Sequence, residues 1–150
     1  MASGRNKGGG GAVKLMSRAL CSVTAIILGL AAGGAGAQGL MGQEPKVLDM
    51  TRGSWAYFRD YNGRQFIYFT HLEAYRCGIS QVRYSLNTQA LDKVWTLQPC
   101  DPKAPQKITT GTPYITLPLG TASEIAVQLT FNDGTRSTVV RIDSANQLIR

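Results

Sequence analysis

The chain has one histidine and three cysteines, and these small numbers exclude several kinds of site. Structural zinc ions are held by clusters of His and Cys, commonly with closely spaced cysteine pairs, and no Cys-x-x-Cys spacing occurs. A Gly-x-Ser-x-Gly turn for a serine nucleophile is missing, as is a phosphate-binding glycine motif after position 37. The aspartates are scattered without calcium-loop spacing. The sequence therefore predicts no metal, no cofactor and no catalytic residue.

The net charge of +7 is basic, but the sequence contains no basic run or stripe that would bind nucleic acid. Of the 16 Lys and Arg, four lie within the first 37 residues, at Arg5, Lys7, Lys14 and Arg18. The remaining 12 stand against 9 Asp and Glu, a net charge of +3. No stretch has the roughly 20 apolar residues that span a membrane. We therefore expect no nucleic-acid partner, and no stable membrane span after the leader is removed.

The first 37 residues have the three parts of a secretory signal peptide. Lys14 and Arg18 precede an apolar run over residues 19–32, and small residues follow that run as far as Ala37. We therefore predict a signal peptide over 1–37, cleaved after Ala37, and a bacterial protein that is periplasmic or secreted. Met16 would open a more compact signal of ordinary length, so it is an alternative start of translation.

Removal of the signal peptide leaves two cysteines, Cys77 and Cys100. An even number of cysteines in a small exported domain indicates a disulfide, because the compartments outside the cytoplasm are oxidising. A bridge between them closes a loop of about two dozen residues and stabilises the fold by on the order of 3 kcal/mol. The sequence therefore predicts one disulfide.

Residues 54–72 carry a strong hairpin pattern. Asn62-Gly63 lies between two runs of aromatic and β-branched residues, and this dipeptide favours a two-residue turn with positive φ angles. Such a turn pairs Tyr57 with Tyr68 and sets aromatic rings and guanidinium groups on one face. Rings beside guanidinium groups suit sugar rings, glycan carboxylates or a protein partner. The predicted binding face comprises Trp55, Tyr57, Arg59, Tyr61, Arg64 and Tyr68.

Further strands are predicted over residues 77–86, 93–97, 114–119, 124–131 and 135–143. Asp133-Gly134 favours a second two-residue turn, which pairs Ile125 with Ile142, Val127 with Val140 and Leu129 with Thr138. In the strand over 114–119 the alternation directs Ile115, Leu117 and Leu119 inward, and the prolines at 113 and 118 favour a sheet edge.

Seven or more short strands, two hairpin turns and no convincing helical pattern predict an all-β fold. We expect a small immunoglobulin-like sandwich of two sheets, with a small β-barrel as the alternative. Residues 38–46 contain glycine and proline without periodicity and are expected to form a flexible arm. Residues 47–150 are expected to form a single disulfide-containing β domain.

The stretch over 79–87, Ile-Ser-Gln-Val-Arg-Tyr-Ser-Leu-Asn, followed by Val94-Trp95, resembles bacterial immunoglobulin-like modules. The closing hairpin through Asp133-Gly134 is similar to theirs as well. In those modules a strand ending in Tyr-Ser-Leu-Asp or Tyr-Ser-Leu-Asn turns into a strand that bears a tryptophan. The resemblance covers about half of the mature chain, and it implies a sandwich fold with a binding or spacer role.

The sequence thus predicts a non-enzymatic protein of the cell envelope that binds a protein partner or an envelope glycan through the hairpin face. One alternative is a small envelope hydrolase. His71 and Glu73 lie two residues apart, on one face if the strand persists, and a His beside a carboxylate is half of an acid–base pair. A second alternative is a structural subunit of an envelope assembly, which would form a homo-oligomer through the aromatic face.

Overall fold

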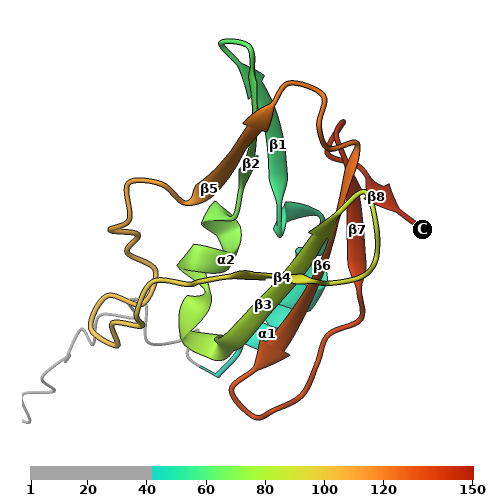
Figure 1. Cartoon of the computed structure of the whole chain (residues 1–150). Helices are drawn as coiled ribbons and strands as arrows, with labels where there is room; N and C mark the ends of the chain where they lie inside the picture. Colours follow the sequence, from blue (N-terminus) through green and yellow to red (C-terminus); the bar gives the residue numbers. More distant parts are fainter. Residues whose placement is uncertain (1–41) are drawn as a thin grey trace, which may run out of the picture. The chain divides into compact units, whose positions relative to one another are not determined.

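Residues 42–150 are described by a computed structural model, and the predicted signal peptide and residues 38–41 lie outside the described part. The described strands form two antiparallel sheets (Figure 1). Three strands are ordered β1-β2-β5, with bounds Tyr57–Tyr61, Arg64–Tyr68 and Tyr114–Pro118. Five are ordered β4-β3-β6-β7-β8, with bounds Lys93–Trp95, Ile79–Leu86, Glu124–Phe131, Val140–Asp143 and Leu148–Ile149. The predicted small all-β sandwich is confirmed.

The first predicted hairpin has the expected pairing, and the second has it away from its turn; the expected pair of Leu129 with Thr138 is wrong, because the carbonyl of Leu129 accepts from the N–H of Ser137. In β1–β2, Tyr57 faces Tyr68 and Arg59 faces Phe66, and the turn residues Asn62 and Gly63 have φ angles of 49° and 71°. These positive φ angles suit Gly, which has no Cβ, and Asn, whose short polar side chain can form hydrogen bonds with the local backbone. In β6–β7, Ile125 faces Ile142 and Val127 faces Val140.

The turn of the second hairpin differs in detail from the prediction. The backbone N–H of Phe131 donates to the carbonyl of Thr135, so the turn contains three residues instead of two. Nearer the turn Thr130 faces Arg136, whereas Val127 faces Val140 further along. Three residues of the returning strand thus lie opposite two residues of β6, and this bulge restores the expected pairing.

The described part contains two short α-helices, which the sequence analysis did not expect. Helix α1 covers Glu44–Met50 and α2 covers Thr70–Ala74, and single 3₁₀ turns, η2 and η3, cover Arg52–Ser54 and Arg76–Gly78. Both helices have at most two turns, too few for an apolar stripe to be visible in the sequence. Helix α1 includes residues 44–46, which were assigned to the flexible arm.

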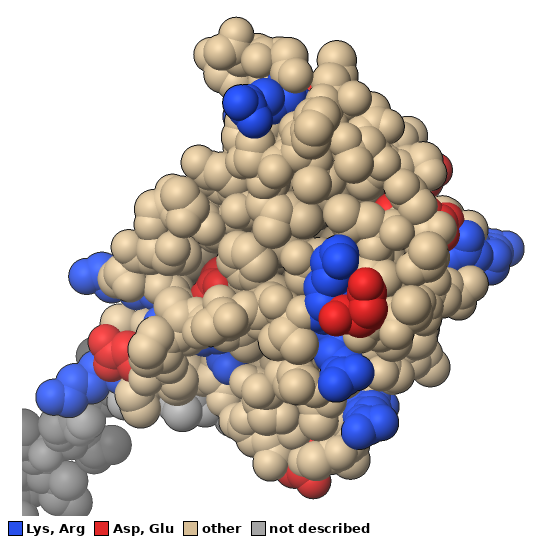
Figure 2. Space-filling view, in the orientation of Figure 1, with Lys and Arg blue, Asp and Glu red and all other residues tan. Residues whose placement is uncertain are grey.

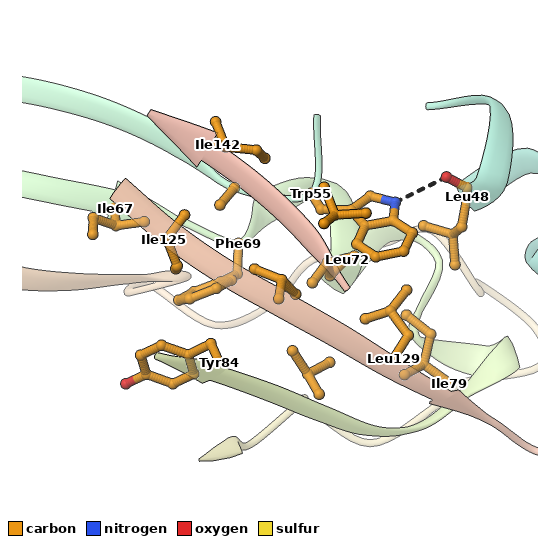
Figure 3. Packing of buried hydrophobic residues seen from close by; sticks show 14 of the residues in the cluster. Leu48, Trp55, Ile67, Phe69, Leu72, Ile79, Tyr84, Ile125, Leu129 and Ile142 are labelled. Atoms are coloured by element: carbon orange, nitrogen blue, oxygen red, sulfur yellow. Dashed lines mark hydrogen bonds between the residues drawn. The ribbon is translucent and has the colours of Figure 1, made fainter. Parts of the chain in front are cut away.

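The apolar core lies between the sheets and is closed at one end by the two helices (Figure 3). Leu48 of α1 and Leu72 of α2 are fully buried against side chains of both sheets. Trp55 donates a hydrogen bond from Nε1 to the carbonyl of Leu48 over 2.9 Å, which joins α1 to the entry of β1. Complete burial of each such large side chain stabilises the fold by roughly 1.5–3 kcal/mol.

Strand β5 is an edge strand, as its prolines predicted, and Ile115 and Leu117 pack against the core. The expectation that Leu119 points inward is wrong, because its side chain is 57 % exposed. Strand β5 ends at Pro118, and the chain turns at Gly120, which has a φ of 73°. The alternation of the strand therefore does not extend to position 119.

Two side-chain amides join the sheets along their open sides. The Gln65 side chain donates to the carbonyl of Ala122 and accepts from its N–H, over 3.0 and 2.8 Å. Asn146, in the β7–β8 turn with a φ of 63°, accepts from the N–H of Phe58 and donates to its carbonyl. Each amide supplies one donor and one acceptor, as a neighbouring strand would, and so satisfies backbone groups that the sheets leave open.

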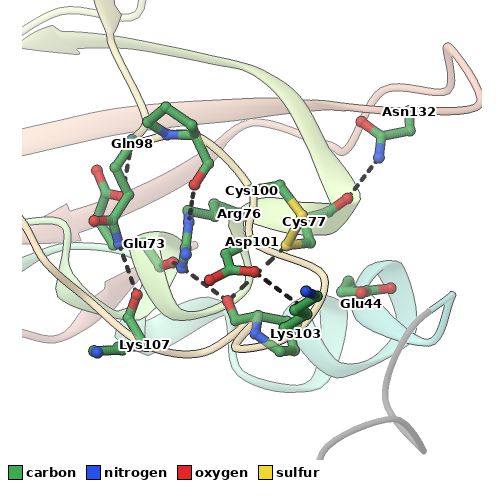
Figure 4. Close-up of a disulfide and its surroundings, with 12 residues drawn as sticks. Glu44, Glu73, Arg76, Cys77, Gln98, Cys100, Asp101, Lys103, Lys107 and Asn132 are labelled. Carbon is green, nitrogen blue, oxygen red and sulfur yellow. Dashed lines mark hydrogen bonds between the residues drawn. A yellow bond between two sulfur atoms is a disulfide. The ribbon is translucent and has the colours of Figure 1, made fainter.

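A long connection, residues 96–113, leads from β4 at the edge of one sheet to β5 at the edge of the other, passing α2 (Figure 1). The predicted disulfide between Cys77 and Cys100 is confirmed, and it ties this connection to η3 (Figure 4). Beside it, the buried Arg76 guanidinium donates to the carbonyls of Pro99, Pro105 and Glu73 over 2.7–2.9 Å. The predicted strand over 77–86 accordingly begins only at Ile79, after η3.

We predict that Arg76→Met lowers the free energy of unfolding by about 2–4 kcal/mol, because three carbonyls lose a charged donor. The measurement is urea unfolding of the mature domain with its disulfide intact. Arg83→Met is the matched control, because the exposed Arg83 side chain donates a hydrogen bond to the Gln81 side chain and to no backbone carbonyl within residues 42–150, so its loss costs less than about 0.5 kcal/mol. Equal losses in the two variants would contradict the assigned role of Arg76.

Candidate functional site

The outer face of the β1–β2–β5 sheet carries most of the predicted binding residues. Strand pairing aligns Tyr57 with Tyr68 and then Tyr114, and it aligns Arg59 with Phe66. Of the residues between them, Phe58, Gln65 and Ile67 point to the opposite side and are buried, whereas Asp60 near the hairpin tip is exposed. We call this surface the aromatic–arginine face; its members are Tyr57, Arg59, Tyr61, Arg64, Phe66, Tyr68 and Tyr114.

The rings of this face contact one another across the strands. The Tyr114 ring lies 5.4 Å from Phe66, edge to face, and 5.0 Å from Tyr68, as measured between ring centroids. The Arg59 guanidinium carbon lies 5.2 Å from the centre of the Tyr61 ring, in cation–π geometry. Tyr57 and Tyr61 are 55 % and 62 % exposed, so these two rings offer their surfaces to solvent. The face is therefore an ordered aromatic surface.

Trp55 does not belong to this face, contrary to the prediction. Its side chain is only 1 % exposed and packs in the core, with its indole N–H on the carbonyl of Leu48 (Figure 3). The expectation assumed that the strand extends back to position 55, whereas β1 begins at Tyr57 and η2 precedes it. The period-two alternation therefore does not apply to Trp55.

Tyr114 was missed by the sequence analysis, because its place depends on pairing between β2 and β5, which are far apart in the chain. A local signal was present: Ile115 and Leu117 were expected to point inward, and alternation puts Tyr114 on the outer side.

A cavity of about 550 Å³ opens beside the rings, where β1 and β2 meet α2. Its wall includes Ser54, Tyr57, Arg59, Tyr68, Thr70 and His71. Its volume lies within the roughly 300–1,000 Å³ of small-molecule sites. The cavity joins His71 to the aromatic–arginine face, so the residue of the hydrolase hypothesis and the residues of the binding hypothesis lie at one site.

The hydrogen bonds of His71 indicate the tautomer of its neutral ring. The Thr51 hydroxyl donates its only proton to the carbonyl of Val47, so toward Nε2 of His71, 2.8 Å away, its oxygen is an acceptor. Nε2 therefore carries a proton, and Nδ1 of the neutral ring is an acceptor. Burial lowers the pKa of His71 from its ordinary value of 6.5, which favours the neutral ring at pH 7.

Glu73 and His71 are not brought together. Both lie on α2, and residues two apart on a helix point to different sides. The buried Glu73 carboxylate accepts hydrogen bonds from Trp95 Nε1 at 2.8 Å and from the N–H of Gln98 at 3.2 Å. The expectation of a shared strand face for this pair is wrong, because β2 ends at Tyr68 and a helix follows.

The aromatic–arginine face and its cavity have a positive charge. Within residues 42–150 neither Arg59 nor Arg64 forms an ion pair, and no carboxylate lines the cavity. Figure 2 shows one group of basic side chains near the tip of the β1–β2 hairpin and several others close together on the right of the view. Among the described residues, His, Cys, Asp and Glu form no group suited to a metal ion. In the same part of the chain, no helix is long and apolar enough to cross a membrane.

Comparisons with protein-family models, curated proteins and solved structures found no match to this chain. The function is therefore inferred from the geometry of the residues. The resemblance to immunoglobulin-like modules stays a prediction.

We predict that His71 makes the stability of the fold depend on pH. The pKa of His71 is lower in the folded protein than in the unfolded chain, so below about pH 6.5 the unfolded chain binds more protons. The free energy of unfolding therefore decreases as the pH is lowered. The measurement is urea unfolding between about pH 7.5 and pH 5.5 for the native chain and His71→Gln. The advantage of the native chain over the variant should shrink as pH falls. An advantage that is constant or grows would contradict the assignment.

Proposed function

We propose that the protein is an exported, non-enzymatic binding protein of the bacterial cell envelope. The aromatic–arginine face and its cavity take the ligand, which is an envelope glycan or a protein partner. Export to the periplasm or the exterior is supported by the predicted signal peptide, and the Cys77–Cys100 disulfide is compatible with an oxidising compartment.

The observation that carries the proposal is the exposure of ordered aromatic rings beside arginines that have no ion-pair partner within the described residues. A sandwich of this size buries most of its large apolar side chains, as this chain does with Trp55 and Phe69. Tyr57 and Tyr61 instead remain more than half exposed, next to Arg59. Tyrosine and arginine together are the residue types that dominate the binding energy of interaction surfaces.

A binding function agrees with the chemistry of the cavity better than hydrolysis does. Within residues 42–150 His71 has no carboxylate partner, because the Glu73 carboxylate accepts from Trp95 and Gln98 on the other side of α2. The remaining wall of the cavity offers hydroxyl groups, rings and one guanidinium, which orient a ligand by hydrogen bonds and stacking.

We expect the double variant Tyr57→Ala/Arg59→Ala to lose at least about tenfold in affinity for the envelope, because each side chain contributes roughly 1 kcal/mol or more. The measurement is co-sedimentation of the purified mature domain with peptidoglycan sacculi and outer-membrane vesicles. Thermal unfolding should show that the variant keeps its fold, because both side chains are exposed.

The matched control is Lys93→Ala/Val94→Ala, which removes one cation and one exposed apolar side chain from β4, in the other sheet. Binding by the control should equal that of the native chain. Equal binding by both double variants, or no binding of the native domain to either fraction, would contradict the proposal.

A further inference from the structure

We infer that the ligand of the cavity is an acidic glycan, and that a carboxylated sugar ring binds between Tyr57, Arg59 and His71. This inference rests on the proposed function, since it names the ligand class of the same site. It follows from three properties of the cavity: its charge, its hydrogen-bonding groups and the arrangement of its rings.

The positive charge of the cavity and its surroundings favours an anionic ligand. Among the residues that the structure describes, Arg59 is the only charged group of the cavity wall, and Arg64 is the only other charge on the aromatic–arginine face. Asp60, between them on β1, alternates to the opposite side of the strand. A ligand with a carboxylate would meet a guanidinium fork that is free of protein carboxylates, and planar bidentate pairing is the geometry that Arg offers.

The hydrogen-bonding groups select a ligand that also carries hydroxyls. Nδ1 of the neutral His71 is an acceptor, because Nε2 donates to Thr51. The hydroxyls of Ser54 and Thr70 can donate and accept. A phosphate dianion or a bare carboxylate has no proton to donate to the imidazole or to the hydroxyl oxygens of the wall. A sugar acid supplies both the anion for Arg59 and hydroxyl donors for Nδ1.

The rings provide flat apolar surfaces for the remaining faces of a sugar. Tyr57 and Tyr68 face each other across β1 and β2 and both line the cavity. The ring of Tyr114 lies 5.0 Å beyond Tyr68, so the aromatic surface continues out of the cavity. A chain of sugars can therefore place one ring in the cavity and extend over the neighbouring strand. A poly-glutamate peptide offers carboxylates but has no ring to stack and no hydroxyl groups.

The test is isothermal titration calorimetry of the mature domain with oligogalacturonate, oligomannuronate and oligosialic acid. Each is paired with its carboxyl-reduced counterpart, which keeps the sugar ring and loses the charge. At least one acidic oligosaccharide should bind at least about tenfold more tightly than its neutral counterpart, and added salt should weaken that binding. A sulfated oligosaccharide and a poly-glutamate peptide are included as other anions.

Arg59→Met should abolish the preference for the acidic form, whereas Lys93→Met, which removes an exposed cation from the other sheet, should leave it unchanged. His71→Gln should weaken acidic and reduced forms by the same factor, because it alters a hydroxyl contact. Thermal unfolding checks that each variant is folded.

Four results would overturn the inference: equal affinity for acidic and reduced forms, tighter binding of the sulfated sugar or the peptide, an unchanged preference in Arg59→Met, or no binding to any acidic sugar. In each case the proposed function stands if the native domain still sediments with envelope fractions and Tyr57→Ala/Arg59→Ala does not. Loss of that difference would remove the proposed function itself.

Discussion

The fold depends on how residues 96–113 are held, because this connection carries the chain from one sheet to the other. Arg76 donates to carbonyls at two points along it, Pro99 and Pro105, and the adjacent Cys77 bonds Cys100 between those points (Figure 4). A buried guanidinium is costly unless its N–H groups are satisfied, so the position of the connection is closely specified. Because the connection is held in this position, β5 pairs with β2, and this pairing puts Tyr114 on the aromatic–arginine face.

Glu73 supplies the other half of this arrangement. Its buried carboxylate accepts from the Trp95 indole at the end of β4 and from the N–H of Gln98. The Gln98 side chain in turn accepts hydrogen bonds from the backbone of Thr109 and Thr110 near the end of the connection. The two charged residues of α2 and η3 thus organise a loop that has no regular structure of its own, and the role of Glu73 is structural. The side-chain amides of Gln65 and Asn146 close the open sides of the sandwich. None of these contacts covers the outer face of β1–β2–β5.

The parts of the fold that local sequence determines could be predicted. Asn62-Gly63 set the β1–β2 pairing, and the alternation in β6 set its pairing with β7 despite the extra residue in the returning strand. The disulfide followed from the count of cysteines in an exported chain.

The errors have physical causes that a local pattern does not contain. Trp55 and Leu119 lie just outside β1 and β5, where period-two alternation no longer applies. His71 lies on a helix of five residues, too short to show helical periodicity. The position of Tyr114 and the cavity depend on contacts between segments that are distant in the chain. The second hairpin turn, at Asn132, contains three residues instead of two because the N–H of Phe131 donates to the carbonyl of Thr135, and a bulge in the returning strand follows.

The most direct test of the account is aromatic side-chain NMR of the mature domain during titration with the acidic oligosaccharide that binds most tightly. If the ligand binds in the cavity, the resonances of Tyr57, Tyr68 and His71 shift with a single saturation curve. Those of Tyr84 in β3 and Trp95 in β4, which belong to the other sheet, should stay in place. Shifts centred on Tyr84 and Trp95, with the cavity residues unchanged, would contradict the central claim that the ligand binds on the outer face of β1–β2–β5.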